Sequence, residues 1–170
     1  NIPNKYLIDN ILLSIEAAQL YKISNSNIIK AINNFKNVEE RLEIINIKNN
    51  ITIINDCYNA SLESIKSSLS VLQQTKKKKM AIIGDVLELG EQSKIIHKKI
   101  EKELEKIKDL QIITVGNHTK IINIGMHFDN NEELKDYLNK QELKDITILI
   151  KGSHNMHLNE IKDQIIKLNA

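Results

Sequence analysis

The chain has 170 residues, about one domain with some residues left over, and 41% of them are hydrophobic, which is enough for a packed core. Its formal net charge of +2 is too close to neutral to indicate a nucleic-acid partner. The single cysteine excludes an internal disulfide, no apolar stretch approaches the length of a membrane span, and the first residues show no signal-peptide pattern. We therefore expect a cytoplasmic domain without membrane insertion.

The first forty residues predict two helices and no strand. Apolar residues recur at helical spacing between residues 5 and 21. Residues 26–35 predict a second, shorter helix, with Ser24 or Ser26 as its N-cap. Because no strand precedes these helices, we expect residues 1–40 to be the helical end of a domain that begins upstream.

From residue 41 onward, strands alternate with helices. Residues 42–47 and 51–56 predict a hairpin around a turn at 48–50. The remaining predicted strands are 80–85, 111–116, 126–128 and 146–152, and the predicted helices are 62–74, 91–108, 117–123, 130–140 and 155–168. Short unbroken apolar runs between amphipathic helices are typical of strands buried on both faces. We therefore predict that residues 41–170 form an α/β domain with a Rossmann-like, mostly parallel sheet and helices on both faces. The lysine run 76–79 is expected to be a solvated loop.

Polar residues and glycines follow four of the predicted strands. Parallel sheets bind ligands at the carboxyl ends of their strands, so a site is expected there. The alternative is that strand ends turn polar simply because loops face water. The residues concerned are Asp56, Gly84-Asp85, Gly116-Asn117-His118 and Lys151-Gly152-Ser153.

Several common site motifs are absent from the sequence. It contains neither G-x-x-x-x-G-K-[ST] nor G-x-G-x-x-G, and no cysteine and histidine residues at zinc-binding spacing. We therefore assign no catalytic residue and no metal ligand. If the domain binds a nucleotide, the phosphates must be held by residues outside this sequence.

Two motifs carry a resemblance to a known family. The first is Asn55-Asp56-Cys57-Tyr58-Asn59-Ala60, and the second is G-D-V-L-E-L-G-E at residues 84–91; each leaves a predicted strand. Together they resemble the MurF branch of the Mur ligase family, which shows D-D-S-Y-N-A-N-P and, further along, G-D-M-L-E-L-G. Arg41-Leu42-Glu43 and Lys151-Gly152-Ser153 resemble the G-R-L-E and K-G-S motifs of these ligases.

The sequence also departs from the family pattern. Cys57 stands where the family usually has serine, and Leu62 stands where a proline would fall. Glu40 replaces the glycine before Arg41. These departures concern individual contacts, whereas the order and spacing of the motifs agree along the whole chain.

The resemblance implies an ATP- and Mg²⁺-dependent ligase that joins D-alanyl-D-alanine to UDP-MurNAc-tripeptide in peptidoglycan synthesis. In such enzymes ATP phosphorylates a substrate carboxylate, and an amine then attacks the acyl phosphate. The P-loop and the metal ligands would lie in a central ATPase domain, of which residues 1–40 would be the helical tail. The C-terminal domain would close over the nucleotide and present the amine, so we expect this chain to be inactive alone. We also expect it to be a monomer.

The resemblance implies a nucleotide-binding set of Arg41, Asp56, Tyr58, Asn59 and Asn10. Arg41 is also notable by itself, because it is the one arginine among 24 basic residues. This suggests a site that needs the planar guanidinium group, whose paired N–H donors a lysine lacks. The alternative for Arg41 is a surface salt bridge with a neighbouring glutamate. The alternative for Asp56 is an N-cap, and for Tyr58 and Asn59 it is turn structure.

A second set is expected to bind the amine dipeptide: Asp85, Leu87, Glu88, Gly90, Lys151 and Ser153. A carboxylate in the 84–90 loop could receive the substrate ammonium, or it could fix the loop by accepting backbone N–H bonds. Lys151 could bind the dipeptide carboxylate, or it could be a solvated lysine. His97 lies in mid-helix among isoleucines, where we expect a packed, hydrogen-bonded histidine.

Other interpretations remain open from the sequence. One is a different Mur ligase or a folylpolyglutamate synthase. Another, from a different class, is a phosphoacceptor receiver domain, which Asp56, Asp85 and Lys151 at strand ends loosely resemble. Receivers, however, carry an acidic pair after their first strand and usually Lys-Pro at the last, where this chain has Asn55-Asp56 and Lys151-Gly152.

Overall fold

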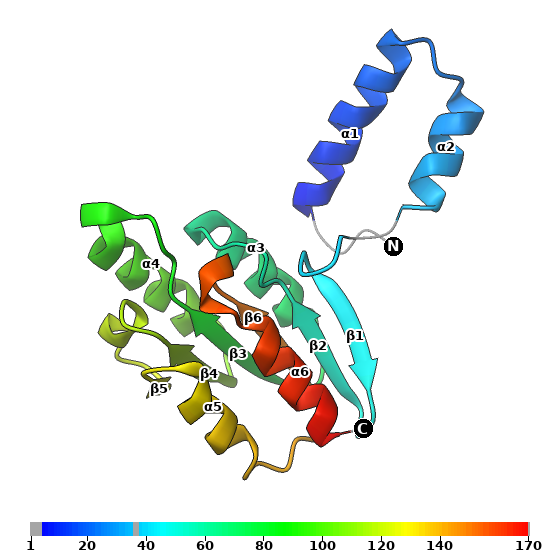
Figure 1. The fold of residues 1–170 in the computed structure, drawn as a ribbon. Helices are drawn as coiled ribbons and strands as arrows, with labels where there is room; N and C mark the ends of the chain where they lie inside the picture. Colours follow the sequence, from blue (N-terminus) through cyan, green and yellow to red (C-terminus); the bar gives the residue numbers. More distant parts are fainter. Residues whose placement is uncertain (1–4, 36–37, 170) are drawn as a thin grey trace. The chain divides into compact units, whose positions relative to one another are not determined.

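A computed structural model describes residues 5–35 and 38–169. The chain divides into two compact units, one ending at Val38 and the other beginning at Glu39 (Figure 1). The first unit holds α1 (Lys5–Leu20) and α2 (Asn25–Asn33), as the periodicity predicted. The Ser24 side chain accepts a hydrogen bond from the backbone N–H of Asn27, which confirms one of the two candidate N-caps. That this unit is the tail of a central ATPase domain stays a prediction.

The second unit is built on a six-stranded sheet with the order β1-β2-β6-β3-β4-β5. β1 is antiparallel to β2, and every other neighbouring pair is parallel. The predicted hairpin and the predicted mostly parallel sheet are therefore confirmed. The strands are β1 (Glu43–Ile47), β2 (Ile51–Asn55), β3 (Lys78–Gly84), β4 (Leu110–Val115), β5 (Met126–Phe128) and β6 (Ile146–Lys151).

Helices cover both faces of this sheet (Figure 1). The helices α3 (Leu62–Gln73) and α4 (Ser93–Glu105) pack on one face, and α5 (Asn131–Leu138) and α6 (Asn159–Leu168) pack on the other. Three short 3₁₀ turns complete the unit: η1 (Gly90–Gln92), η2 (Thr119–Ile121) and η3 (His154–Met156). The predicted helix at 117–123 is thus only a 3₁₀ turn. The predicted last helix begins at Asn159, after η3.

The alternation along β6 explains why the sequence signal was a continuous apolar run. Ile148 and Ile150 contribute to the core beneath α5 and α6, whereas Leu149 contributes to the core beneath α3 and α4. Every residue of this central strand is buried. A strand covered on both faces has no solvent side, and therefore no polar alternation.

The prediction that the lysine run 76–79 is a solvated loop is wrong for its second half. Lys78 and Lys79 belong to β3, where Lys79 pairs with Leu110 of β4 and Thr147 of β6. The Nζ of Lys77 donates hydrogen bonds to the Asn50 carbonyl and to Thr52 Oγ1. Lysine is tolerated at the first residues of a strand because its stem packs while its ammonium reaches polar groups at the surface.

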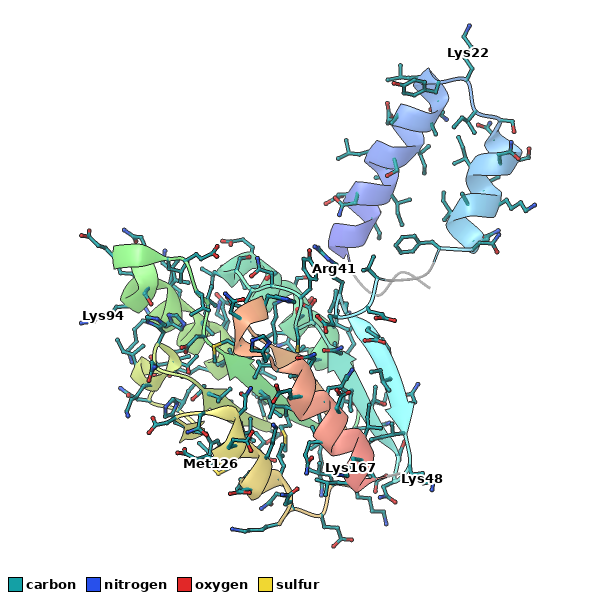
Figure 2. The ribbon with its side chains drawn as sticks, in the orientation of Figure 1. Lys22, Arg41, Lys48, Lys94, Met126 and Lys167 are labelled. Atoms are coloured by element: carbon teal, nitrogen blue, oxygen red, sulfur yellow. The ribbon has the colours of Figure 1, made fainter. Side chains whose placement is uncertain are left out.

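The parallel arrangement brings the carboxyl ends of β2, β3, β4 and β6 to one edge of the sheet. Figure 2 shows Arg41 at this edge of the unit, with Lys48 and Lys167 near the opposite edge. The loops that the sequence singled out therefore lie together. Among the described residues, no helix is both long and apolar enough to span a bilayer.

Candidate functional site

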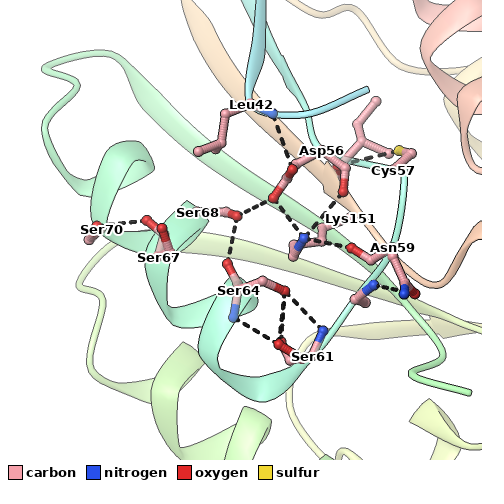
Figure 3. A network of polar contacts seen from close by, with 12 residues as sticks. Leu42, Asp56, Cys57, Asn59, Ser61, Ser64, Ser67, Ser68, Ser70 and Lys151 are labelled. Atoms are coloured by element: carbon pink, nitrogen blue, oxygen red, sulfur yellow. Dashed lines mark hydrogen bonds and ion pairs between the residues drawn. The ribbon is translucent and has the colours of Figure 1, made fainter. Parts of the chain in front are cut away.

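A buried ion pair joins the ends of β2 and β6 (Figure 3). The Nζ of Lys151, whose side chain is 1% exposed, lies 2.7 Å from Oδ2 of Asp56. It also donates to the backbone carbonyls of Asp56 (3.3 Å) and Asn59 (2.9 Å). An ammonium has three N–H donors, so these acceptors occupy all of them. The solvated-lysine alternative is therefore wrong, and Lys151 holds the turn that carries Asn59.

The Asp56 carboxylate has further internal partners. Its Oδ1 accepts the backbone N–H of Leu42 at 3.1 Å, and its Oδ2 accepts the hydroxyl of Ser68 in α3 at 2.5 Å. Asp56 thus ties the segment before β1 to α3 and β6. It does not cap α3, because Ser61 is the N-cap and forms a capping box with Ser64.

Arg41 stacks on the neighbouring aromatic ring. Its guanidinium carbon lies 4.0 Å from the ring centroid of Tyr58, which is within cation–π range. The backbone N–H of Tyr58 donates to the Glu40 carbonyl, and the Tyr58 side chain is 46% exposed. Within residues 38–169, neither Glu39, Glu40 nor Glu43 forms an ion pair with Arg41, so the salt-bridge alternative is not what the structure shows.

The backbone on both sides of Arg41 is left-handed. The φ angles are 60° at Glu40 and 49° at Leu42. A non-glycine residue in this region costs about 1–2 kcal/mol. This strain explains why a glycine would suit position 40.

Two adjacent pockets open beside this turn, and both are lined by Tyr58 and Asn59. The first, which we call the Arg41 pocket, has a volume of about 270 Å³ and is lined by Arg41, Asp56, Tyr58, Asn59, Ala60, Ser61, Ser64 and Lys151. The second, which we call the Glu88 pocket, also measures about 270 Å³ and is lined by Tyr58, Asn59, Leu87, Glu88, Ser153, His154 and Asn155. The Tyr58–Asn59 turn therefore separates two neighbouring spaces.

The 84–90 loop is fixed by polar contacts from other segments. The Asp85 carboxylate accepts the backbone N–H groups of His118 (3.0 Å) and Thr119 (2.7 Å). The backbone N–H of Leu87 donates to Ser153 Oγ at 2.8 Å. Asp85 therefore fixes the loop through backbone N–H bonds, which was the alternative to ammonium binding.

Close approach explains the glycine at the end of β4. Gly116 has a φ of 114°, and a Cβ there would lie 2.6 Å from the Asp85 carboxylate. Glycine allows the two loops to meet and lets Asp85 reach the N–H groups beyond it.

His97 and Cys57 are both buried. His97 is hydrogen-bonded on both ring nitrogens, as expected from its position in the sequence. Burial raises the pKa of the Cys57 thiol to about 12, and its Sγ lies 3.4 Å from the Ile150 carbonyl. Cys57 is therefore a small, inert core residue.

The structure brings most of the predicted site residues together. Those that line one or both pockets are Arg41, Asp56, Tyr58, Asn59, Lys151, Leu87, Glu88 and Ser153. Asp85 and Gly90 belong to the same loop but line neither pocket, and Asn10 is exposed on α1 in the first unit. Binding roles for these residues stay predictions.

Sequence reasoning missed His154 and Asn155, which line the Glu88 pocket. The available signal was their position directly after the K-G-S motif. It also missed Ser61 and Ser64, the capping-box pair that lines the Arg41 pocket.

The fold and the motifs at its strand ends define the class of protein. A family model described as "Mur ligase, glutamate ligase domain" matches residues 40–154, well over half of the chain, and the chain therefore belongs to the Mur ligase family. This membership confirms the resemblance carried by the two motifs and replaces the receiver interpretation.

Known relatives narrow the comparison to one branch of the family. The UDP-N-acetylmuramoyl-tripeptide--D-alanyl-D-alanine ligase of Buchnera aphidicola (strain APS) is 35% identical over 76% of this chain and 30% of that protein. MurF from Acinetobacter baumannii has the same fold, with a TM-score of 0.85 at 23% identity over 96% of this chain and 38% of that one. MurF from Thermotoga maritima, solved with ADP, has a TM-score of 0.70 at 25% identity over 79% and 32%. The chain thus spans well under half the length of these relatives.

Proposed function

We propose that this chain is part of an ATP-dependent ligase that joins D-alanyl-D-alanine to UDP-N-acetylmuramoyl-tripeptide. The name of the Buchnera aphidicola relative states this reaction, and the ADP in the Thermotoga maritima structure supports a nucleotide site. Because the chain spans 30–38% of these relatives, the activity is that of the longer protein. The expected cytoplasmic location and monomeric state stay predictions.

The observation that carries the proposal is the pair of adjacent pockets. The Arg41 pocket offers a guanidinium whose carbon lies 4.0 Å from the centroid of the Tyr58 ring, beside the polar Asn59. A flat aromatic face suits the ring of a nucleotide, and the planar guanidinium can add one contact to phosphates that residues outside this sequence would mainly hold. The Glu88 pocket, across the Tyr58–Asn59 turn, offers an exposed carboxylate that suits the ammonium of an incoming amine.

Proximity is the main chemical contribution that we propose for this unit. When bound, ATP supplies the phosphoryl group that activates a substrate carboxylate. In this proposal the nucleotide and the amine bind on either side of the Tyr58–Asn59 turn, which lowers the entropic cost of bringing the reactants together. Lys151 and Asp56 maintain that turn through internal bonds, so we propose a supporting role for Lys151 in place of dipeptide binding.

The described residues form no cluster of Mg²⁺ ligands. Within residues 5–35 and 38–169, no group of three or more histidine, cysteine, aspartate or glutamate side chains could hold a metal ion. We therefore derive no step through the metal in this part of the enzyme.

A titration of the purified 170-residue chain with ADP tests the proposal, followed by ¹⁵N–¹H NMR of the assigned backbone amides. The expected result is a set of saturable shifts at Arg41, Tyr58 and Asn59, which Arg41→Ala abolishes. Lys48→Ala is the matched control, because Lys48 lies at the opposite end of the sheet (Figure 2) and should leave the binding curve unchanged. Shifts confined to other regions, or binding that survives Arg41→Ala, would contradict the nucleotide assignment.

The same purified chain should form no amide from ATP, D-alanyl-D-alanine and UDP-N-acetylmuramoyl-tripeptide. The reason is that its sequence contains no phosphate-cradling G-x-x-x-x-G-K-[ST] loop. Measurable turnover by the 170-residue chain would show that its residues do more than we propose.

A further inference from the structure

His97 makes two hydrogen bonds that define its protonation state. Its Nε2 lies 3.2 Å from the backbone nitrogen of Val86, in the 84–90 loop. A backbone N–H can only donate, so Nε2 must accept and carry no proton. Nδ1 lies 2.8 Å from the Ser93 carbonyl, which can only accept, so Nδ1 carries the proton. The buried ring is therefore neutral, with its proton on Nδ1.

The bond to Val86 is one of three ties through side chains that fix the loop, beside the backbone hydrogen bond from the Ser153 N–H to the Asp85 carbonyl. In the second tie, the Asp85 carboxylate accepts the backbone N–H groups of His118 and Thr119. In the third, Ser153 Oγ accepts the backbone N–H of Leu87. A serine hydroxyl does not titrate near neutral pH. Among these three ties, histidine is the group whose ordinary pKa lies nearest to neutrality.

The loop needs these ties because its own backbone is strained. Glu88 has a left-handed φ of 63°, whereas Gly90 adopts its φ of 51° without strain, and both residues are exposed. Leu89, between them, packs against the core beneath α3 and α4, so this contact and the polar contacts at the base together determine the position of the loop. Leu87 and Glu88, which these contacts place, are the residues that the loop contributes to the Glu88 pocket.

The groups around His97 come from several elements. Burial lowers the pKa of His97, the nearby Asp85 carboxylate partly offsets this, and the His118 ring, stacked at 5.9 Å between centroids, reinforces it. The other charged side chains on the elements packed against α4 are exposed: Glu63 and Lys66 of α3, Glu91 of η1 and Lys120 of η2.

We infer that His97 is a positioning residue: its neutral imidazole holds the 84–90 loop in the conformation that forms the wall of the Glu88 pocket. A second proton on the ring would place an N–H at Nε2, facing the N–H of Val86, and the tie would be lost. An effect of His97 on catalysis rests on the proposed function of that pocket. Its effect on the loop does not.

Amide hydrogen exchange in the 170-residue chain tests the inference without any ligand. When the loop opens, His97 regains its ordinary pKa of 6.5 and takes up a proton below that pH. The protection factor of the Val86 amide should therefore fall by up to about tenfold from pH 7.5 to pH 5.5. A Val86 protection factor that does not change over this range would overturn the inference.

Three variants separate positioning from simple packing. His97→Gln keeps a carbonyl acceptor for Val86 but cannot titrate, so Val86 should stay protected at both pH values. His97→Leu removes the acceptor, so protection should be lost at both. His127→Gln is the matched control, because His127 lies on β5 and hydrogen-bonds Thr114, and it should keep the wild-type pH response. A pH response that persists in His97→Gln, or protection that persists in His97→Leu, would refute the inference.

The ¹⁵N shifts of the His97 ring in the wild-type chain provide a readout that depends on no variant folding. At pH 7.5 they should report a protonated Nδ1 and an unprotonated Nε2. A proton on Nε2 at that pH would exclude the bond to Val86, and with it the positioning role. Failure of ADP binding would leave all of these results unaffected, so the two proposals can fail separately.

Discussion

Replacing Lys151 by methionine tests the buried ion pair most sharply. Methionine is similar in length and apolar, so it fills the space of the lysine stem but leaves the Asp56 carboxylate without its cation. The variant also removes the donor to the Asn59 carbonyl. Removing one partner of a buried pair costs about 3–5 kcal/mol, because the remaining charge is left uncompensated.

The structure indicates the lower end of this range. Asp56 keeps the N–H of Leu42 and the hydroxyl of Ser68 as partners in the variant. We therefore expect Lys151→Met to lower the free energy of unfolding by about 3 kcal/mol. Adding Asp56→Asn removes the stranded charge and should recover about 1–2 kcal/mol, so the double variant should be more stable than Lys151→Met alone.

Urea unfolding at pH 7, followed by circular dichroism, measures these differences. Lys167→Met is the control, because Lys167 is exposed on α6 and its replacement should change stability by less than about 0.5 kcal/mol. The reasoning is refuted if Lys151→Met matches this control. It is equally refuted if Asp56→Asn destabilises the Lys151→Met variant further.

Three further predictions concern separate features of the molecule. The Cys57 thiol, whose burial raises its pKa to about 12, should react with iodoacetamide at pH 8 only in urea; rapid labelling of the folded chain would contradict this burial. Glu40→Gly should raise the free energy of unfolding by about 0.5–1 kcal/mol, because glycine adopts the left-handed φ of 60° without strain. The control Glu39→Gly should not raise it. Equal effects of the two replacements in urea unfolding would argue against stored strain at position 40. The pKa of His97 is lower in the folded than in the unfolded chain, so the unfolded state binds more protons and stability should fall as the pH drops below about 6.5. His97→Gln should remove this component, and unfolding curves at pH 7.5 and 5.5 that respond alike in both proteins would contradict it.

The fold was predictable because its signals are local. The continuous apolar run at residues 146–151 follows from the burial of that strand on both faces. The helical periodicity of residues 62–73 follows from the burial of that helix on one face. The start of β3 was not predictable from such signals. Lys78 joins the strand because Ile146 of β6 provides a backbone partner, and the sequence does not show which strand lies alongside.

The location of the site could be predicted from the sequence, but the hydrogen bonds that its residues make could not. The motifs place Asp56, Asp85 and Lys151 at one sheet edge, and the structure confirms that placement. Their internal bonds depend on partners distant in sequence, since Lys151 reaches Asp56 across 95 residues and Asp85 reaches Thr119 across 34. Residue type and the K-G-S motif suggested ligand binding for Lys151, which stays a prediction, whereas the bonds that its ammonium makes within the domain could not be read from the sequence.

A titration of the ADP-saturated chain with D-alanyl-D-alanine, followed by backbone amide NMR, tests the pair of adjacent pockets directly. Simultaneous occupation predicts new shifts at Leu87, Glu88 and Ser153, while the ADP-induced shifts at Arg41 and Tyr58 persist. Displacement of ADP by the dipeptide would contradict the two-pocket arrangement. Dipeptide shifts confined to residues outside the Glu88 pocket would contradict it as well.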